Sequence, residues 1–153
     1  IFRGSPVQTQ VAVRDFPLMT KNSPRRVLVV DDEFLIRWSV TQVLEAQGYE
    51  VAEAGDGHGA LVAIRESALP FDAVLLDFRL PDSNDLTLLK TIRGLTPSSS
   101  VIMITAHNSP ELQAQAMGLG AFRVMNKPFE VDSLAALVEH ACSASDSTSG
   151  AKS

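Results

Sequence analysis

The sequence predicts an α/β protein with one doubly wound, five-stranded parallel sheet and helices on both faces. Short runs rich in β-branched residues alternate five times with segments of helical period, which is typical of repeated βαβ units. Three of these runs, VLVV, AVLL and VIMI, are continuously apolar, as expected for parallel strands that are covered on both faces. Right-handed crossovers then make the doubly wound orders the leading topologies.

The first pair of elements is a strand at residues 27–31 and a helix from about residue 33 to residue 47. Gly48 follows that helix, in the position where helices commonly end with a left-handed residue. The second pair is a strand at residues 50–54 and a short helix, separated by a Gly-Asp-Gly-His-Gly loop. The apolar faces of the two helices comprise Ile36, Val40, Val43 and Leu44, and then Ala60, Leu61 and Ile64.

The third, fourth and fifth strands are predicted at residues 73–76, 101–104 and 121–125. Each is followed by a segment that we interpret as a helix. Ser109 and Pro110 supply an N-cap and a first-turn proline for the fourth helix, which runs to about residue 117. The apolar residues of the third and fifth helices are Leu86, Leu89 and Ile92, and then Val131, Leu134, Leu137, Val138 and Ala141.

Charged and hydroxyl side chains stand where four of these strands end. Asp31 and Asp32 follow the first strand, and Asp77 follows the third. Thr105 ends the fourth strand, and Lys127 comes just after the fifth. The carboxyl ends of the strands of an open parallel sheet converge on one crevice, so we expect these side chains to meet around one ligand.

Three carboxylates in one crevice repel one another unless a cation neutralises them. Mg²⁺ prefers oxygen ligands and commonly binds one or two carboxylates together with waters and a phosphate, so the three aspartates suit it. An aspartate is also a nucleophile towards phosphorus when its charge is screened, and Lys127 with the metal would screen it. Thr105 would then donate a hydrogen bond to a phosphoryl oxygen. Each residue alone has a simpler structural explanation, so the hypothesis depends on their joint placement.

Composition narrows the class of protein. An apolar content of 45% with 20% charged residues is ordinary for a globular domain, and a net charge of −5 argues against nucleic-acid binding by this segment. We find no apolar run long enough for a membrane helix and no signal peptide, so we expect a cytoplasmic protein. Cys142 is interpreted as a plain thiol, because no catalytic partner for it is evident.

Three segments are predicted along the chain. Residues 1–25 are interpreted as an N-terminal extension, for which Met19 would be a natural start. Residues 26–142 form the folded domain. Residues 143–153 are rich in Ser, Gly and Ala, which favours a flexible tail or the start of a linker.

Four segments in this order, VLVVDDE, DFRLPDSNDL, VIMITAH and GAFRVMNKPF, resemble the receiver domain of two-component response regulators over about residues 26–141. The first segment and its continuation LIRWSV are most similar to receivers of nitrogen-regulation-type transcription activators. The resemblance implies the flavodoxin-like strand order 2-1-3-4-5. It also implies a signalling domain, not an enzyme, that accepts a phosphoryl group from a phosphohistidine, loses it slowly by hydrolysis and signals by a conformational change.

The resemblance further implies a role for each residue of the crevice. Asp77 would be the phosphoacceptor, Thr105 the switch hydroxyl, and Lys127 the partner of the phosphoryl group. Mg²⁺ would be held by Asp31, Asp32, Asp77 and the backbone carbonyl of Arg79. The peptide bond between Lys127 and Pro128 would be cis.

Partners also follow from the resemblance. They are a sensor histidine kinase or phosphotransfer protein, a C-terminal output domain outside this chain, and a second copy in a phosphorylation-dependent homodimer; no membrane partner is expected. Trp38, four residues after Phe34, would form an exposed aromatic patch on the first helix, a face that receivers commonly show to their kinase.

Two departures from the family pattern leave alternatives open. Val124 stands where receivers usually carry the switch Tyr or Phe, and Phe122, expected on the same strand face, is a weak substitute. Asp85 stands where the family normally has Gly, which predicts a shifted loop with an extra negative charge. One alternative is therefore a binding module that no longer switches. Another is a phosphatase with an Asp nucleophile, although Arg79 occupies the place of its acid.

Overall fold

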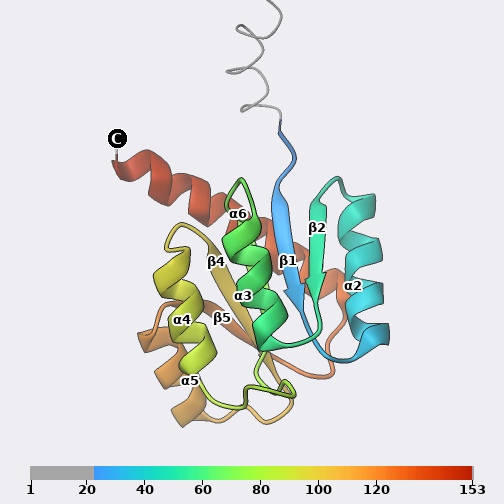
Figure 1. Cartoon of the computed structure of the whole chain (residues 1–153), viewed down its shortest axis with the longest axis vertical. Coiled ribbons are helices and arrows are strands. Elements are labelled where there is room, and N and C mark those ends of the chain that lie inside the picture. Colours follow the sequence, from blue (N-terminus) through green and yellow to red (C-terminus); the bar gives the residue numbers. More distant parts are fainter. Residues whose placement is uncertain (1–22, 153) are drawn as a thin grey trace, which may run out of the picture.

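The computed structural model describes residues 23–152, and the side chains of residues 23–144. Its five strands form one parallel sheet in the order β2-β1-β3-β4-β5, which confirms the predicted fold and order. The strands are β1 Arg26–Val30, β2 Glu50–Ala54, β3 Ala73–Asp77, β4 Ser100–Thr105 and β5 Ala121–Asn126. The helices are α2 Phe34–Ala46, α3 Gly57–Glu66, α4 Thr87–Leu95, α5 Pro110–Gly118 and α6 Val131–Lys152 (Figure 1).

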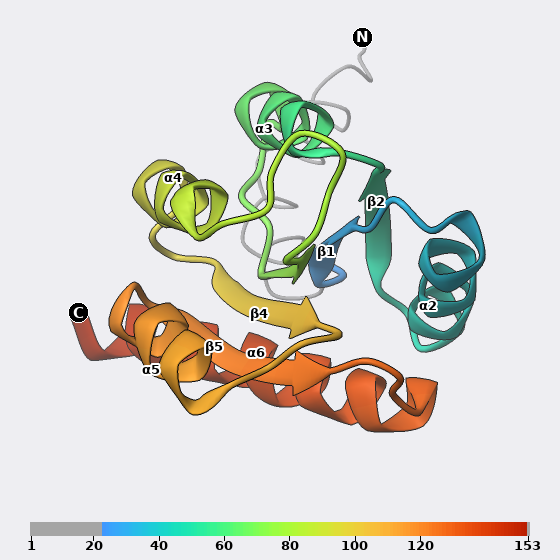
Figure 2. The ribbon, with the colours of Figure 1, turned by 90° about the horizontal axis from the view of Figure 1, so that it is seen from below.

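The sheet separates two apolar cores, because successive side chains of a strand point to opposite faces. One core lies beneath α3, α4 and α5 and includes Leu28, Val30, Leu76, Leu89 and Met103. The other lies beneath α2 and α6 and includes Val27, Val29, Leu75, Val40 and Leu134. Figure 2 shows α3 and α4 on one side of the sheet and α6 on the other. The continuous apolar runs of the sequence are thus explained by burial on both faces.

Most helix boundaries follow the predicted local signals. Gly48 has φ +98°, the left-handed conformation expected directly after a helix. The Ser109 side chain accepts a hydrogen bond from the N–H of Leu112 at 3.0 Å, and Pro110 opens α5 as predicted. One boundary differs: α3 begins at Gly57, inside the predicted loop. The Asp56 carboxylate caps that helix by accepting from the N–H of Gly59 at 2.7 Å, which outweighs the low helix propensity of the glycines.

The C-terminal helix is longer than the sequence pattern suggests. Its backbone stays helical to Lys152, across the segment that favoured a flexible tail or the start of a linker. Extension of an existing helix costs little free energy because the helix is already nucleated, which accounts for the difference. Cys142 is buried in the core beneath α2 and α6, where it packs as a small apolar residue.

The expected shared face of Phe122 and Val124 is wrong. The pairing register between β4 and β5 shifts after Val101, so that Ile102 pairs with Arg123. This bulge inserts one residue and reverses the alternation of side chains. Val124 therefore packs against the core beneath α3, α4 and α5, whereas Phe122 packs against the opposite core. The centroids of the Phe122 and His140 rings are 5.7 Å apart.

Candidate functional site

Four strand ends meet at the carboxyl edge of the sheet, as predicted. In Figure 1 the arrows of β1 and β2 point downward, and Figure 2 views the molecule from that side. Asp31 follows β1, Asp77 closes β3 and Thr105 closes β4. The N–H of Lys127, which follows β5, donates to the carbonyl of Thr105 at 2.8 Å and so keeps the lysine beside the sheet. The peptide bond between Lys127 and Pro128 is cis, as the sequence resemblance implies.

Lys127 is the centre of the cluster. Its Nζ lies 3.0 Å from Asp31 Oδ2, 3.0 Å from Asp77 Oδ2 and 2.7 Å from Glu33 Oε1. Burial of the ammonium lowers the pKa of Lys127, but hydrogen bonds to Glu33, Asp31 and Asp77 outweigh this effect and raise the pKa above its usual value. Lys127 therefore stays charged and offsets part of the negative charge around it.

Asp77 is the most perturbed carboxylate of the site. Only 5% of the residue is exposed, because β3 is the central strand of the sheet and neighbours cover both of its faces. Burial raises the pKa of Asp77 to about 6, the hydrogen bond from Lys127 opposes this rise, and the nearby charge of Asp31 adds to it. The N–H of Arg79 donates to Asp77 Oδ1 at 3.2 Å. An aspartate held in this state carries an excess of negative potential that a cation would relieve.

The acidic residues after β1 divide into inner and outer positions. Asp31 is buried, and its Oδ1 accepts from the N–H of Glu33 at 2.8 Å. Asp32 is exposed, and its carboxylate lies outside the group of carboxylate oxygens within 4.8 Å of one another that the described residues form. That group consists of Asp31, Glu33 and Asp77. Glu33 is thus a site residue that the sequence reasoning missed, although it is the third letter of the acidic DDE segment.

Thr105 ends β4 as predicted, and Arg79 lies just beyond the end of β3. The Thr105 residue is 1% exposed, and its Oγ1 accepts from the N–H of His107 at 3.1 Å. The hydroxyl therefore keeps its own proton for another acceptor. Arg79 is exposed and follows Asp77 by two residues in the loop after β3.

The loop after β3 is fixed to a neighbouring helix by Asp82, which the sequence reasoning did not single out. Its carboxylate accepts from the N–H of Gly57 at 2.7 Å and of His58 at 2.9 Å, at the start of α3. These two hydrogen bonds lower the pKa of Asp82. Such a contact between distant segments leaves no local pattern in the sequence.

Asp85 needs no unusual backbone conformation. Glycines alone have positive φ among residues 23–152, so Asp85 does not occupy the left-handed region in which a side chain would be strained. Its Oδ1 accepts from the N–H of Thr87 at 2.9 Å, which favours the start of α4. The aspartate thus adds a charge to the loop without the conformational cost that a residue with positive φ would carry.

A divalent cation fits this donor set. The grouped oxygens of Asp31, Glu33 and Asp77 are all carboxylate oxygens, the hard ligands that Mg²⁺ prefers. Thiolate or imidazole donors would suit other metals, but the grouped atoms include neither. The excess of carboxylates over the single ammonium supplies the physical reason for cation binding.

An exposed apolar surface adjoins the crevice. Phe34, Leu35 and Trp38 on α2 are 61%, 73% and 50% exposed. Next to them lies a groove of about 540 Å³ between α2 and the segment after β5, and its lining includes Ile36, Lys127 and Phe129. The predicted exposure of Phe34 and Trp38 is therefore confirmed, and Leu35 beside them lines the groove that reaches Lys127.

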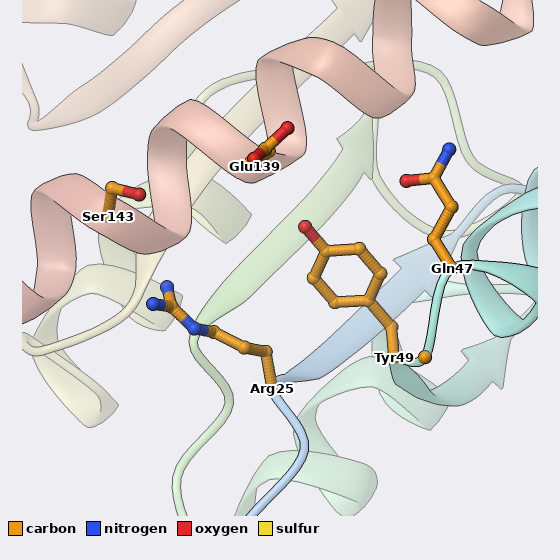
Figure 3. A pocket seen from close by; sticks show the side chains of 6 residues that line it. Arg25, Gln47, Tyr49, Glu139 and Ser143 are labelled. Carbon is orange, nitrogen blue, oxygen red and sulfur yellow. The ribbon is translucent and has the colours of Figure 1, made fainter. Parts of the chain in front are cut away.

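A second hollow lies at the other end of the sheet and does not adjoin the crevice. Its volume is about 310 Å³, and Figure 3 shows its side chains, from α6, from Arg25 before β1 and from the turn between α2 and β2. Burial raises the pKa of Tyr49, and Cys142 and Glu139 add to this rise. The lining residues are Arg25, Gln47, Gly48, Tyr49, Glu139 and Ser143.

Comparison with known proteins bears on this arrangement. The family model described as the response regulator receiver domain matches residues 27–139. The chain is 38% identical over 117 residues to the DNA-binding transcriptional regulator NtrC of Salmonella typhimurium, covering 76% of this chain and 24% of that protein. It is 36% identical over 115 residues to the transcriptional regulatory protein ZraR of Escherichia coli, covering 75% and 26%.

A solved structure has the same fold as this chain. The CheY-like receiver domain protein of Methanospirillum hungatei superposes with a TM-score of 0.77 and 30% identity, covering 82% of this chain and 99% of that one. The chain thus spans about a quarter of the length of its two regulator relatives. Among residues 23–152, no helix is long and apolar enough to cross a membrane.

Proposed function

The chain belongs to the response regulator receiver family, and from this premise we propose that Asp77 accepts the phosphoryl group that makes this receiver signal. One observation carries the proposal: the buried Asp77 carboxylate lies 3.0 Å from Lys127 Nζ, beside a second buried carboxylate, Asp31. Both the lysine and a bound cation would screen the approach of an anionic donor. We further propose that residues 26–142 form the receiver and that residues 143–153 lead out of it.

The proposed reaction is an in-line displacement at phosphorus. An Asp77 carboxylate oxygen forms the new P–O bond while the P–N bond of a phosphohistidine breaks, and the imidazole leaves with the electron pair of that bond. Lys127 would then donate to a phosphoryl oxygen, and the Thr105 hydroxyl would donate to another. Slow attack by water on the aspartyl phosphate would restore Asp77, so the domain would act as a signal carrier, not as an enzyme with turnover.

Mg²⁺ would neutralise the negative charge that the carboxylates and the phosphoryl group bring together. We propose Asp31, Asp32, Asp77 and the carbonyl of Arg79 as its ligands. Asp32 is exposed, so we propose that it binds from the solvent side, either to the ion or to a water on it. Asp31 and Asp77 would be the inner, buried ligands.

The partners proposed for the domain follow from its surfaces and its family. Phe34, Leu35 and Trp38 are exposed beside the crevice, and burial of their side chains would favour docking of a sensor histidine kinase or phosphotransfer protein there. Because the regulator relatives are much longer than this chain, we also propose a C-terminal output domain, with homodimerisation that depends on phosphorylation. We place these partners in the cytoplasm.

Small phosphodonors test the proposed function without the kinase. With Mg²⁺ and acetyl phosphate, the wild-type chain is expected to shift to a slower band on a Phos-tag gel, and Asp77→Asn is expected to remove that shift. Chelation of Mg²⁺ should abolish it as well. An equal shift in Asp77→Asn would place the phosphoryl group elsewhere and reject the proposal.

A receiver that no longer switches is the second candidate, and Val124 favours it. The side chain is packed in the core beneath α3, α4 and α5, and the ring of Phe122 lies on the opposite face of the sheet. Val124 has no aromatic ring, and the ring of Phe122 cannot move towards Thr105 from the other side of the sheet. Backbone NMR shifts distinguish the candidates: a switching domain is expected to change signals in α5 and β5 when beryllofluoride occupies the site, and a passive one only around Asp77.

A further inference from the structure

Glu33 occupies the N-cap position of α2 but does not cap the helix. Its side chain accepts no hydrogen bond from the N–H groups of the first turn. Glutamate is also not among the residues that favour this position, where Ser, Thr, Asp and Asn lead. The carboxylate instead reaches across to Lys127, with 2.7 Å between Oε1 and Nζ. The Glu33 side chain thus pairs with Lys127 in the crevice and leaves the N-terminus of α2 without a side-chain cap.

This contact saturates Lys127. An ammonium has three N–H donors, and here three carboxylates lie within 3.0 Å of Nζ: Asp31, Glu33 and Asp77. A phosphoryl oxygen that pairs with Lys127 must therefore displace one of them. The Asp31 and Asp77 side chains are only 4% and 6% exposed, whereas that of Glu33 is 58% exposed. Water can solvate a released Glu33, so its displacement costs least.

We propose that Glu33 is a positioning residue that occupies one N–H of Lys127 until the phosphoryl group arrives, and that it thereby slows the phosphorylation of Asp77. The inference rests on the proposed function of Asp77. It assigns to Glu33 a role different from those proposed for the buried aspartates, of which Asp31 would bind the metal and Asp77 would accept the phosphoryl group. The rate of Asp77 phosphorylation would then depend partly on how readily the ion pair between Glu33 and Lys127 breaks.

Glu33→Gln tests the proposal, because it keeps the shape of the side chain but removes its charge, which weakens the hydrogen bond that Lys127 donates to it. With saturating Mg²⁺, phosphorylation by acetyl phosphate is expected to become about two- to fivefold faster, the modest factor typical of a partly exposed ion pair. The Mg²⁺ affinity of each variant is measured first by calorimetry, because Glu33 also lies in the carboxylate group. Rates are then compared at metal saturation for every variant.

Glu33→Asp separates the contact from the charge. Aspartate keeps the negative charge but is one methylene shorter, so it loses the 2.7 Å contact with Lys127. If the contact matters, Glu33→Asp speeds phosphorylation as Glu33→Gln does. If Glu33 only repels anionic donors from a distance, Glu33→Asp keeps the wild-type rate, and this outcome would overturn the proposal.

A matched control lies at the other end of the sheet. Glu50 is 61% exposed and pairs with Arg26 at 2.8 Å, so Glu50→Gln removes the same charge from a similar ion pair far from the crevice. Its phosphorylation rate is expected to equal that of the wild type. The ¹H–¹⁵N signal of the Lys127 ammonium gives an independent readout: Glu33→Gln should speed its proton exchange with water, and Glu50→Gln should not.

The outcomes distinguish failure of this inference from failure of the proposed function. Wild-type labelling that requires Asp77, together with an unchanged or slower rate in Glu33→Gln at metal saturation, overturns the role of Glu33 alone. Labelling that persists in Asp77→Asn overturns the proposed function itself. Faster labelling in both Glu33 variants, with faster exchange of the Lys127 ammonium protons, supports the inference.

Discussion

Both ends of the sheet carry charged side chains, but the charges are balanced at one end only. At the amino end, Arg26 Nε lies 2.8 Å from Glu50, its Nη1 donates to Ser67 at 2.7 Å, and its guanidinium lies over the ring of Phe71. At the carboxyl end, one ammonium, that of Lys127, faces three carboxylates. The first arrangement is complete within the fold, whereas the second has negative charge left for a ligand to neutralise.

The largest expected difference between the two ends concerns their cations. Lys127→Met leaves carboxylates uncompensated in a buried place, and we expect it to lower the free energy of unfolding by about 2–4 kcal/mol. Arg26→Met removes a more exposed pair and should cost only about 1 kcal/mol. Urea unfolding in EDTA measures both. An equal or larger loss for Arg26→Met would contradict the contrast between the ends.

The pH dependence of stability is the next test. The pKa of Asp77 is about 6 in the folded protein, above its ordinary value of 3.8, so the folded state binds the proton more tightly. Stability should therefore fall as pH rises from about 4 to about 6 in the absence of metal. Asp77→Asn should lose this dependence and be more stable than the wild type by about 1–3 kcal/mol at pH 7. If the stability of the two proteins depended on pH in the same way, the raised pKa of Asp77 would be contradicted.

Metal binding should restore the balance at the carboxyl end. A cation that binds only the folded state raises the melting temperature in proportion to the logarithm of its concentration above Kd. We expect Mg²⁺ to stabilise the wild type and Glu50→Gln alike, and to stabilise Asp31→Asn much less. Differential scanning fluorimetry at several Mg²⁺ concentrations measures this. An unchanged Mg²⁺ response in Asp31→Asn would remove that residue from the metal site.

The smallest expected effect sharpens the comparison at the edge of the crevice. Asp82→Asn keeps a side-chain acceptor but removes the charge that receives two N–H groups at the start of α3. A loss of about 0.5–1 kcal/mol in unfolding free energy is expected, the usual size for a charge at a helix N-terminus. Thermal unfolding of Asp85→Asn provides the control, because the Asp85 carboxylate accepts from Thr87, only two residues later in the chain.

The sequence predicted the parts of the fold that local patterns determine. Continuous apolar runs identified the strands, Ser109 and Pro110 identified the start of α5, and the strand ends identified Asp31, Asp77 and Lys127 as neighbours. Each of these features depends on residues close in sequence or on the general geometry of parallel sheets. These features could therefore be predicted from the sequence alone.

The remainder depends on contacts between distant segments. The reach of Glu33 to Lys127 joins residues after β1 to residues after β5, and the reach of Asp82 to Gly57 joins two loops. The bulge that places Phe122 on the opposite face from Val124 arises from pairing with β4, and the sequence of β5 alone does not predict it. Such features follow from packing, which a single sequence does not display.

The central claim is that the convergence of four strand ends makes Asp77 the phosphoryl acceptor. Trapping with borohydride tests it most directly, because reduction of an aspartyl phosphate converts that aspartate to homoserine. After reaction with acetyl phosphate and Mg²⁺, peptide mass spectrometry should find homoserine at position 77. Homoserine at position 31 or 32, or no conversion at any aspartate, would contradict the account.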